Sequence, residues 1–106
     1  MPKYLFHASY TEEGLKGLLQ EGGSSRRNAV EQTIKGLGGT LEAFYYAFGD
    51  TDVYAVCDFP DDASAAAVSL LINAAGAVQV SLTPLLAVED IDAAAQKTPS
   101  YRPPGS

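Results

Sequence analysis

The chain has 106 residues, a hydrophobic fraction of 46% and a formal net charge of −6. This length and composition fit a single small domain with a hydrophobic core. Proteins that bind nucleic acid usually carry a basic stripe, because phosphate contacts supply most of the affinity. The 7 lysines and arginines of this chain form no such stripe, so a DNA or RNA partner is not expected.

Membrane, metal and redox features are also missing from the sequence pattern. No apolar run approaches the roughly 20 residues that a membrane-spanning helix needs. A strand-like pattern starts at Tyr4 and leaves no room for a signal peptide, so we expect a cytoplasmic protein without a membrane partner. Cys57 is the single cysteine and His7 the single histidine. We therefore expect no disulfide, no metal site and no cofactor.

The first half of the chain predicts a strand followed by a broken helical region. Residues 4–10 are apolar and rich in aromatic side chains, which is typical of a buried strand. Thr11 is suited to cap a helix. Helical spacing of apolar residues then stops at residues 22–25 (Gly-Gly-Ser-Ser), where we expect a flexible break. Spacing resumes over residues 26–37 and ends at Gly38.

A hairpin follows, formed by strands at residues 40–48 and 53–59 around a turn from Gly49 to Asp52. Pro60 ends the second of these strands. The remaining elements are a helix capped by Asp61 or Asp62, a strand, a short helix and a flexible proline-rich tail (61–76, 77–86, 89–97 and 98–106). The domain is therefore expected to occupy residues 1–97.

The resulting order, β-α-β-β-α-β with the first helical region in two pieces, is that of a ferredoxin-like α+β fold. Right-handed crossovers place both helical layers on one face of a four-stranded antiparallel sheet. The expected strand order is 4-1-3-2, with residues 4–10 and 53–59 in the centre.

Alternation along each strand divides the side chains into two faces. One set is small and apolar, and we assign it to the helix-covered core (Tyr4, Phe6, Ala8, Leu41, Ala43, Tyr45, Val53, Ala55, Cys57, Val78, Val80 and Leu82). The opposite set mixes large aromatic and polar side chains (Leu5, His7, Ser9, Glu42, Phe44, Tyr46, Phe48, Tyr54, Val56, Asp58, Gln79, Ser81, Thr83 and Leu85). A face with so many aromatic residues is not expected to lie bare to water. A second copy of the sheet is the simplest cover, which predicts a homodimer or an assembly of such dimers.

Several short segments together resemble a known family. They are the strand up to Tyr10 with Thr11-Glu12-Glu13-Gly14, then Leu37-Gly38-Gly39, Phe44-Tyr45, Gly49-x-x-Asp52 and Phe59-Pro60-Asp61-Asp62. The span from Lys3 to about Asp90 is similar to the GYD-domain family of small bacterial and archaeal proteins. This resemblance implies a dimeric α+β barrel in which two sheets enclose a pocket. Thr51 stands where the family has its namesake tyrosine, so no role of that tyrosine carries over.

The candidate site residues lie on the expected uncovered face and at its turn. His7 is a candidate general base or, less directly, a haem ligand, because imidazole titrates near neutral pH. It is equally suited to a hydrogen bond inside a dimer interface. Asp52 and Gly49 are expected to hold the turn, since a turn carboxylate can accept bonds from backbone N–H groups. The candidate ligand-binding residues are His7, Glu42, Phe44, Tyr46, Tyr54 and Asp58.

Three functions remain open at this point. The first is a dimer that binds a small apolar or aromatic molecule between its sheets. The second is an enzyme of the cofactor-free oxygenase or isomerase type, in which His7 and inner-face tyrosines handle protons. The third is a structural dimer with a filled barrel. The sequence contains no strong catalytic constellation, which favours the first.

Overall fold

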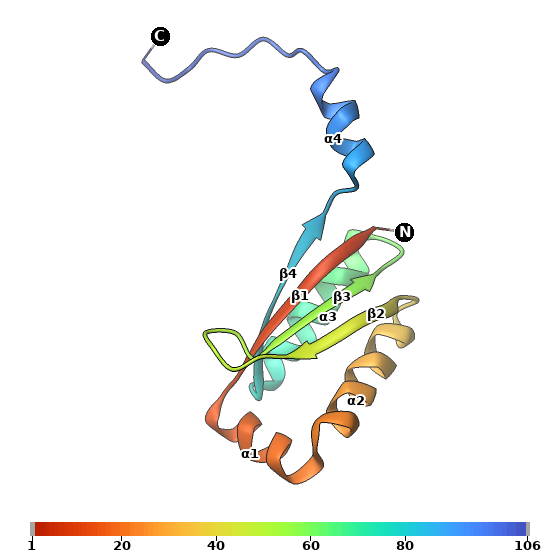
Figure 1. Cartoon of the computed structure of the whole chain (residues 1–106), viewed down its shortest axis with the longest axis vertical. Helices are drawn as coiled ribbons and strands as arrows, with labels where there is room; N and C mark the ends of the chain where they lie inside the picture. The colour runs from red at the N-terminus through yellow and green to blue at the C-terminus, as the bar shows by residue number, and fades with distance from the viewer. Residues whose placement is uncertain (1, 106) are drawn as a thin grey trace.

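The computed structural model describes residues 2–105. Strands and helices alternate in the expected βαββαβ order, with an additional C-terminal helix (Figure 1). The elements are β1 (Lys3–Tyr10), α1 (Glu12–Glu21), α2 (Gly23–Gly36), β2 (Thr40–Tyr46), β3 (Val53–Asp58), α3 (Asp62–Ala75), β4 (Val78–Leu85) and α4 (Val88–Ala95).

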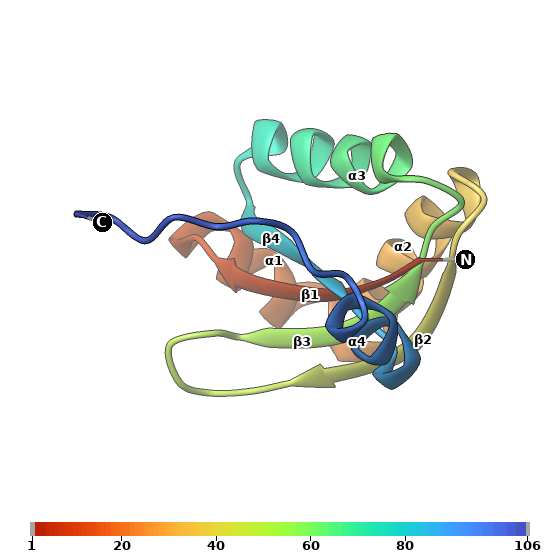
Figure 2. The same ribbon diagram turned by 90° about the horizontal axis from the view of Figure 1, so that it is seen from above.

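The strands form one antiparallel sheet in the order β2-β3-β1-β4. These are the neighbours expected from the sequence, read from the opposite edge of the sheet. Helix α2 packs against β2 and α3 against β4, and both lie on the same side of the sheet (Figure 2). The ferredoxin-like α+β architecture predicted from the sequence is confirmed.

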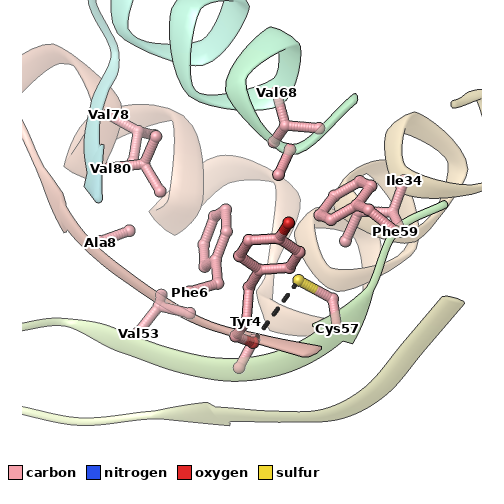
Figure 3. Packing of buried hydrophobic residues seen from close by; sticks show 12 residues of the cluster. Tyr4, Phe6, Ala8, Ile34, Val53, Cys57, Phe59, Val68, Val78 and Val80 are labelled. Atoms are coloured by element: carbon pink, nitrogen blue, oxygen red, sulfur yellow. Dashed lines mark hydrogen bonds between the residues drawn. The ribbon is translucent and has the colours of Figure 1, made fainter. Parts of the chain in front are cut away.

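The hydrophobic core lies between the sheet and the helices. Its strand residues are those assigned from alternation in β1, β3 and the start of β4, and helices α2 and α3 contribute Ile34 and Val68 (Figure 3). The rings of Tyr4 and Phe59 meet edge to face with centroids 5.7 Å apart. The Tyr4 hydroxyl donates a hydrogen bond to Asp62 at the start of α3. This bond satisfies the only polar atom of an otherwise apolar side chain.

Strand β2 contains a β-bulge that the sequence did not reveal. Leu41 pairs with Cys57, but Ala43 pairs with Val56, so Glu42 is an extra residue in the ladder. In a bulge, two residues of one strand oppose one residue of the partner strand. The alternation of side chains is therefore reversed in β2 after Glu42.

This reversal overturns the face assignment for the second half of β2. Phe44 is paired with Ala55 and belongs to the helix-covered side, where it packs against the core. Tyr46 follows it on that side, at the margin of the helix layer. Ala43 and Tyr45 instead lie on the uncovered face, and Tyr45 is 70% exposed. Phe48 lies beyond the strand, in the loop between β2 and β3, and is exposed.

The break between α1 and α2 is shorter than the expected flexible segment at residues 22–25. Only Gly22 separates the two helices, with a positive φ of 87° and its amide donating to the Leu18 carbonyl at 2.8 Å. Gly23 begins α2 close to the Tyr46 ring, and a Cβ on Gly23 would lie 3.0 Å from that ring. Packing against β2 thus fixes the direction in which α2 leaves the break.

The C-terminal part of the chain leaves the body of the domain. Helix α4 lies beyond the end of β4, and the following residues continue away from the sheet (Figure 1). Its apolar side chains are exposed, Val88 by 76% and Ile91 by 55%. Nothing in this segment covers the face of the sheet opposite the helices.

Candidate functional site

The sheet face opposite the helices is the candidate site, and strand pairing arranges its side chains in rows. His7 of β1 lies opposite Tyr54 of β3 on one side and Ser81 of β4 on the other. Tyr45 of β2 lies opposite Tyr54. Directly opposite residues of antiparallel strands project on the same face with Cβ atoms about 5 Å apart. These residues therefore form a continuous central row across the sheet.

The central row is largely open to solvent. Tyr54 is 44% exposed, and His7 is half-buried. The His7 Nε2 atom lies 3.4 Å from the Thr83 Oγ1 atom of β4, a long hydrogen bond. The imidazole ring and the two tyrosine rings thus present an aromatic surface with polar tips, as small-molecule sites and protein interfaces both do.

The adjoining row is apolar. It consists of Ala43, Val56 and Leu5 with Thr83 at the β4 edge. None of these side chains is charged. This row continues the apolar surface of the central row toward the start of β1.

An ion cluster closes that end of the face. The Lys3 ammonium group donates to Glu42 and, at 3.1 Å, to Asp58. The hydrogen bond to Glu42, followed by the bond to Asp58, raises the pKa of Lys3. Glu42, the bulged residue, and Asp58 therefore share one lysine and do not form an isolated acid–base pair.

The opposite end of the face is held by Asp52. Its Oδ2 atom accepts a hydrogen bond from the Tyr10 amide at 2.8 Å, and its own amide donates to the Ala8 carbonyl at 2.8 Å. The loop between β2 and β3 is thereby tied to the end of β1. Gly49 in the same loop has a negative φ and nothing within 4 Å of its Cβ position, so no contact requires glycine there.

Two of the six candidate residues lie elsewhere. The Tyr46 hydroxyl donates to the Gly23 carbonyl at 2.8 Å, and its ring meets Phe44 edge to face at 5.2 Å. Partial burial, together with neighbouring Tyr10, raises the pKa of Tyr46 to about 12. Both side chains belong to the helix-covered side and cannot line a site on the open face.

The structure thus brings His7 and Tyr54 together and links Glu42 to Asp58 through Lys3. Sequence reasoning missed Tyr45, because the bulge reverses β2, and Lys3, because it precedes the apolar strand pattern. The ion cluster had one signal in the sequence. Lys3 stands at the start of a strand, and two other strands of the sheet carry the carboxylates of Glu42 and Asp58.

The described part of the chain was searched for clusters of metal-ligating side chains and for membrane-spanning helices. Among residues 2–105, no group of three or more histidine, cysteine, aspartate or glutamate side chains is arranged to hold a metal ion. Within the same residues, no helix has both the length and the apolar character needed to cross a bilayer.

A family model described as the GYD domain matches residues 4–95. The chain belongs to the GYD-domain family. The match begins in β1 and ends with α4, so the exposed C-terminal helix is part of the matched GYD domain. Among curated proteins and among solved structures, no significant match to the chain was found.

Proposed function

We propose that this GYD domain forms a two-fold homodimer whose open sheet faces pack together and enclose a small apolar or aromatic molecule. The observation that carries the proposal is the row of Tyr45, Tyr54 and His7 across an uncovered sheet. Helices cover only the other face, and α4 extends away from the domain.

The distribution of charged side chains on the open face favours a second copy of the chain as the cover of that face. The central row and the apolar row beside it contain no carboxylate, lysine or arginine. The charged groups lie at the end, where Lys3 is bonded to Glu42 and Asp58. Burial of an unpaired charge is strongly unfavourable. Packing two such faces together avoids this cost, because no charged side chain lies in the middle of the face.

The side-chain sizes support a space for a ligand between the sheets. Sheets pack face to face at about 10 Å, a gap that large side chains from both sides must fill. Tyr45 and Tyr54 can span it, but Ala43, Ser9 and Ser81 cannot. The space over these small residues would be bordered by aromatic rings and by the polar tips of His7 and Tyr54, as in small-molecule sites.

Light scattering of the Val56→Asp variant tests this proposal. Val56 lies in the apolar row, so an aspartate there would be buried without a partner in the dimer but solvated in the monomer. We expect the unchanged protein to have twice the 11.1 kDa chain mass and the variant to have the chain mass.

Leu19→Asp provides the matched control. Leu19 is an exposed apolar residue on α1, remote from the open face, and its replacement should leave the dimer intact. A Val56→Asp variant that stays dimeric, or an unchanged protein that is monomeric at tens of micromolar, would overturn the proposal.

A further inference from the structure

A space remains between the two helices that pack on the sheet. Helix α2 packs on β2 and α3 on β4, which are the two edge strands. A cavity of about 120 Å³ lies between the helices, above the central strands. The strands contribute Phe6, Ala8, Phe44, Val53 and Val78 to its lining.

The size of this cavity corresponds to one small ring. Protein interiors seldom leave voids much larger than a water molecule, and an apolar cavity of about 150 Å³ is known to bind benzene. Small side chains create the space here: Ala8 on the sheet and Ala29 on α2 stand where larger residues would fill it.

The cavity is lined mainly by apolar side chains and by a few polar ones. Ile72 of α3 and Val30 of α2 contribute to the apolar lining, whereas Arg26, Tyr10 and Thr33 supply polar groups. The Arg26 side chain is 30% exposed and forms an ion pair with Glu21, with its Nη1 atom 3.8 Å from the carboxylate. That separation is too long for a hydrogen bond. The guanidinium group therefore keeps N–H donors for an anion, and a carboxylate is its best geometric partner.

We propose that this cavity binds a small aromatic carboxylate, with the ring between α2 and α3 and the carboxylate at Arg26. The apolar lining matches a single ring, and the one arginine matches a single negative charge. The site lies on the opposite side of the sheet from His7 and Tyr54. It is contained in one chain and does not depend on the proposed dimer.

Fluorine NMR titration with 4-fluorobenzoate tests the site, with 4-fluorobenzyl alcohol as the uncharged probe of similar shape. We expect Arg26→Gln to weaken benzoate binding by at least about tenfold, in the range expected for a lost charge-assisted hydrogen bond. The same change should alter binding of the alcohol less than about threefold, because the ring contacts remain.

Arg27→Gln is the matched control. Arg27 lies on the same helix and is not among the residues that line the cavity. Its replacement by glutamine removes the same charge as the replacement of Arg26. It should leave the affinity for both probes unchanged. Equal losses from the two arginine variants would mean general charge attraction and would overturn the proposal.

Ala29→Leu tests the position of the ring, because the larger side chain should fill the cavity and abolish binding of both probes. Val30→Ala, which enlarges the same wall, should permit a bulkier ring such as that of 2-naphthoate. Binding that survives Ala29→Leu, or that is abolished by His7→Ala, would place the probe elsewhere and overturn the proposal. Failure of the whole protein to bind 4-fluorobenzoate at millimolar concentration would also overturn it.

These results are separable from those on the proposed dimer. A Val56→Asp monomer that retains 4-fluorobenzoate supports the cavity whatever the open face binds. If the protein is dimeric but does not bind 4-fluorobenzoate, the proposed function stands and the proposed cavity site is wrong.

Discussion

Buried ionisable side chains determine how the stability of this chain depends on alkaline pH. Cys57 is fully buried, its sulfur near the Tyr4 carbonyl oxygen at 3.9 Å (Figure 3), and burial raises the pKa of its thiol to about 11. The hydrogen bond to Asp62, followed by burial, raises the pKa of Tyr4 to about 12. In both residues the fold favours the protonated form.

The stability of the fold should therefore decrease at alkaline pH. The ordinary pKa values are 9.0 for the cysteine and 10.0 for the tyrosine. Because the folded values are higher, the unfolded chain loses these protons first. The contribution to stability is complete below about pH 9 and is lost as the pH rises toward 11 to 12. Urea unfolding at a series of pH values measures this change, and a free energy of unfolding that is constant from pH 8 to 11 would contradict it.

Tyr4→Phe isolates the tyrosine contribution. The variant loses the hydrogen bond to Asp62, so we expect a decrease of about 1 kcal/mol in the free energy of unfolding at neutral pH. Its stability should also depend less on pH above 10, because one of the groups whose pKa the fold raises is gone. An unchanged alkaline slope in the variant would mean that Tyr4 is not the residue responsible.

At the scale of elements, helix α1 is fixed by a close approach to the start of β4. Thr11 caps the helix by accepting from the Gly14 amide at 3.2 Å and also donates to the Ala77 carbonyl at 3.1 Å. Gly14 lies so close to Ala77 that an added Cβ would come 1.9 Å from the Ala77 oxygen. Only glycine permits this packing of helix on backbone.

Two glycines of α1 provide a matched pair of substitutions. Gly14→Ala should destabilise the protein by about 1–3 kcal/mol, because the methyl group meets backbone that cannot move aside cheaply. Gly17 has nothing within 4 Å of its Cβ position, so Gly17→Ala should stabilise it by about 0.4–1 kcal/mol through the reduced entropy of the unfolded chain. Thermal unfolding measures both effects, and a Gly14→Ala variant at least as stable as the unchanged protein would contradict the close α1–β4 contact.

At the scale of the whole molecule, the two faces of the sheet carry different proposed sites. In the proposed dimer a second copy completes the open face, whereas the cavity under α2 and α3 belongs to one chain. Exposed Leu70 and Leu71 on α3 lie on neither site.

His7→Ala tests whether the open face binds a ligand or only a second copy. If the proposed dimer binds a ligand near His7 and Tyr54, native mass spectrometry of the unchanged protein should detect a retained small molecule. The variant should remain dimeric and lose that molecule, since an unsatisfied buried polar group costs about 1–3 kcal/mol. A variant that dissociates instead would assign His7 to the interface alone. Tyr54→Phe keeps the ring that packs between the sheets, so this variant should also remain dimeric.

The sequence by itself determined the strand order and the faces of the central strands. Buried Tyr4, Phe6 and Ala8 alternate with partly exposed Leu5 and His7 as predicted. Helix ends were also readable, because a cap depends on residues a few positions apart: Thr11 begins α1 and Asp61 caps α3 through the Ser64 amide. Such signals are local in the chain.

Only the tertiary structure decided the features that depend on contacts between distant segments. The bulge at Glu42 is defined by pairing with β3, and it moved Phe44 and Tyr46 to the helix side and Tyr45 to the open face. Lys3 joins Glu42 and Asp58 across three strands. The cavity at Arg26 exists because α2 and α3 pack on opposite edges of the sheet. A periodic pattern records which side of its own strand a residue occupies, but an extra residue or a gap between helices arises only when the strands and helices pack together.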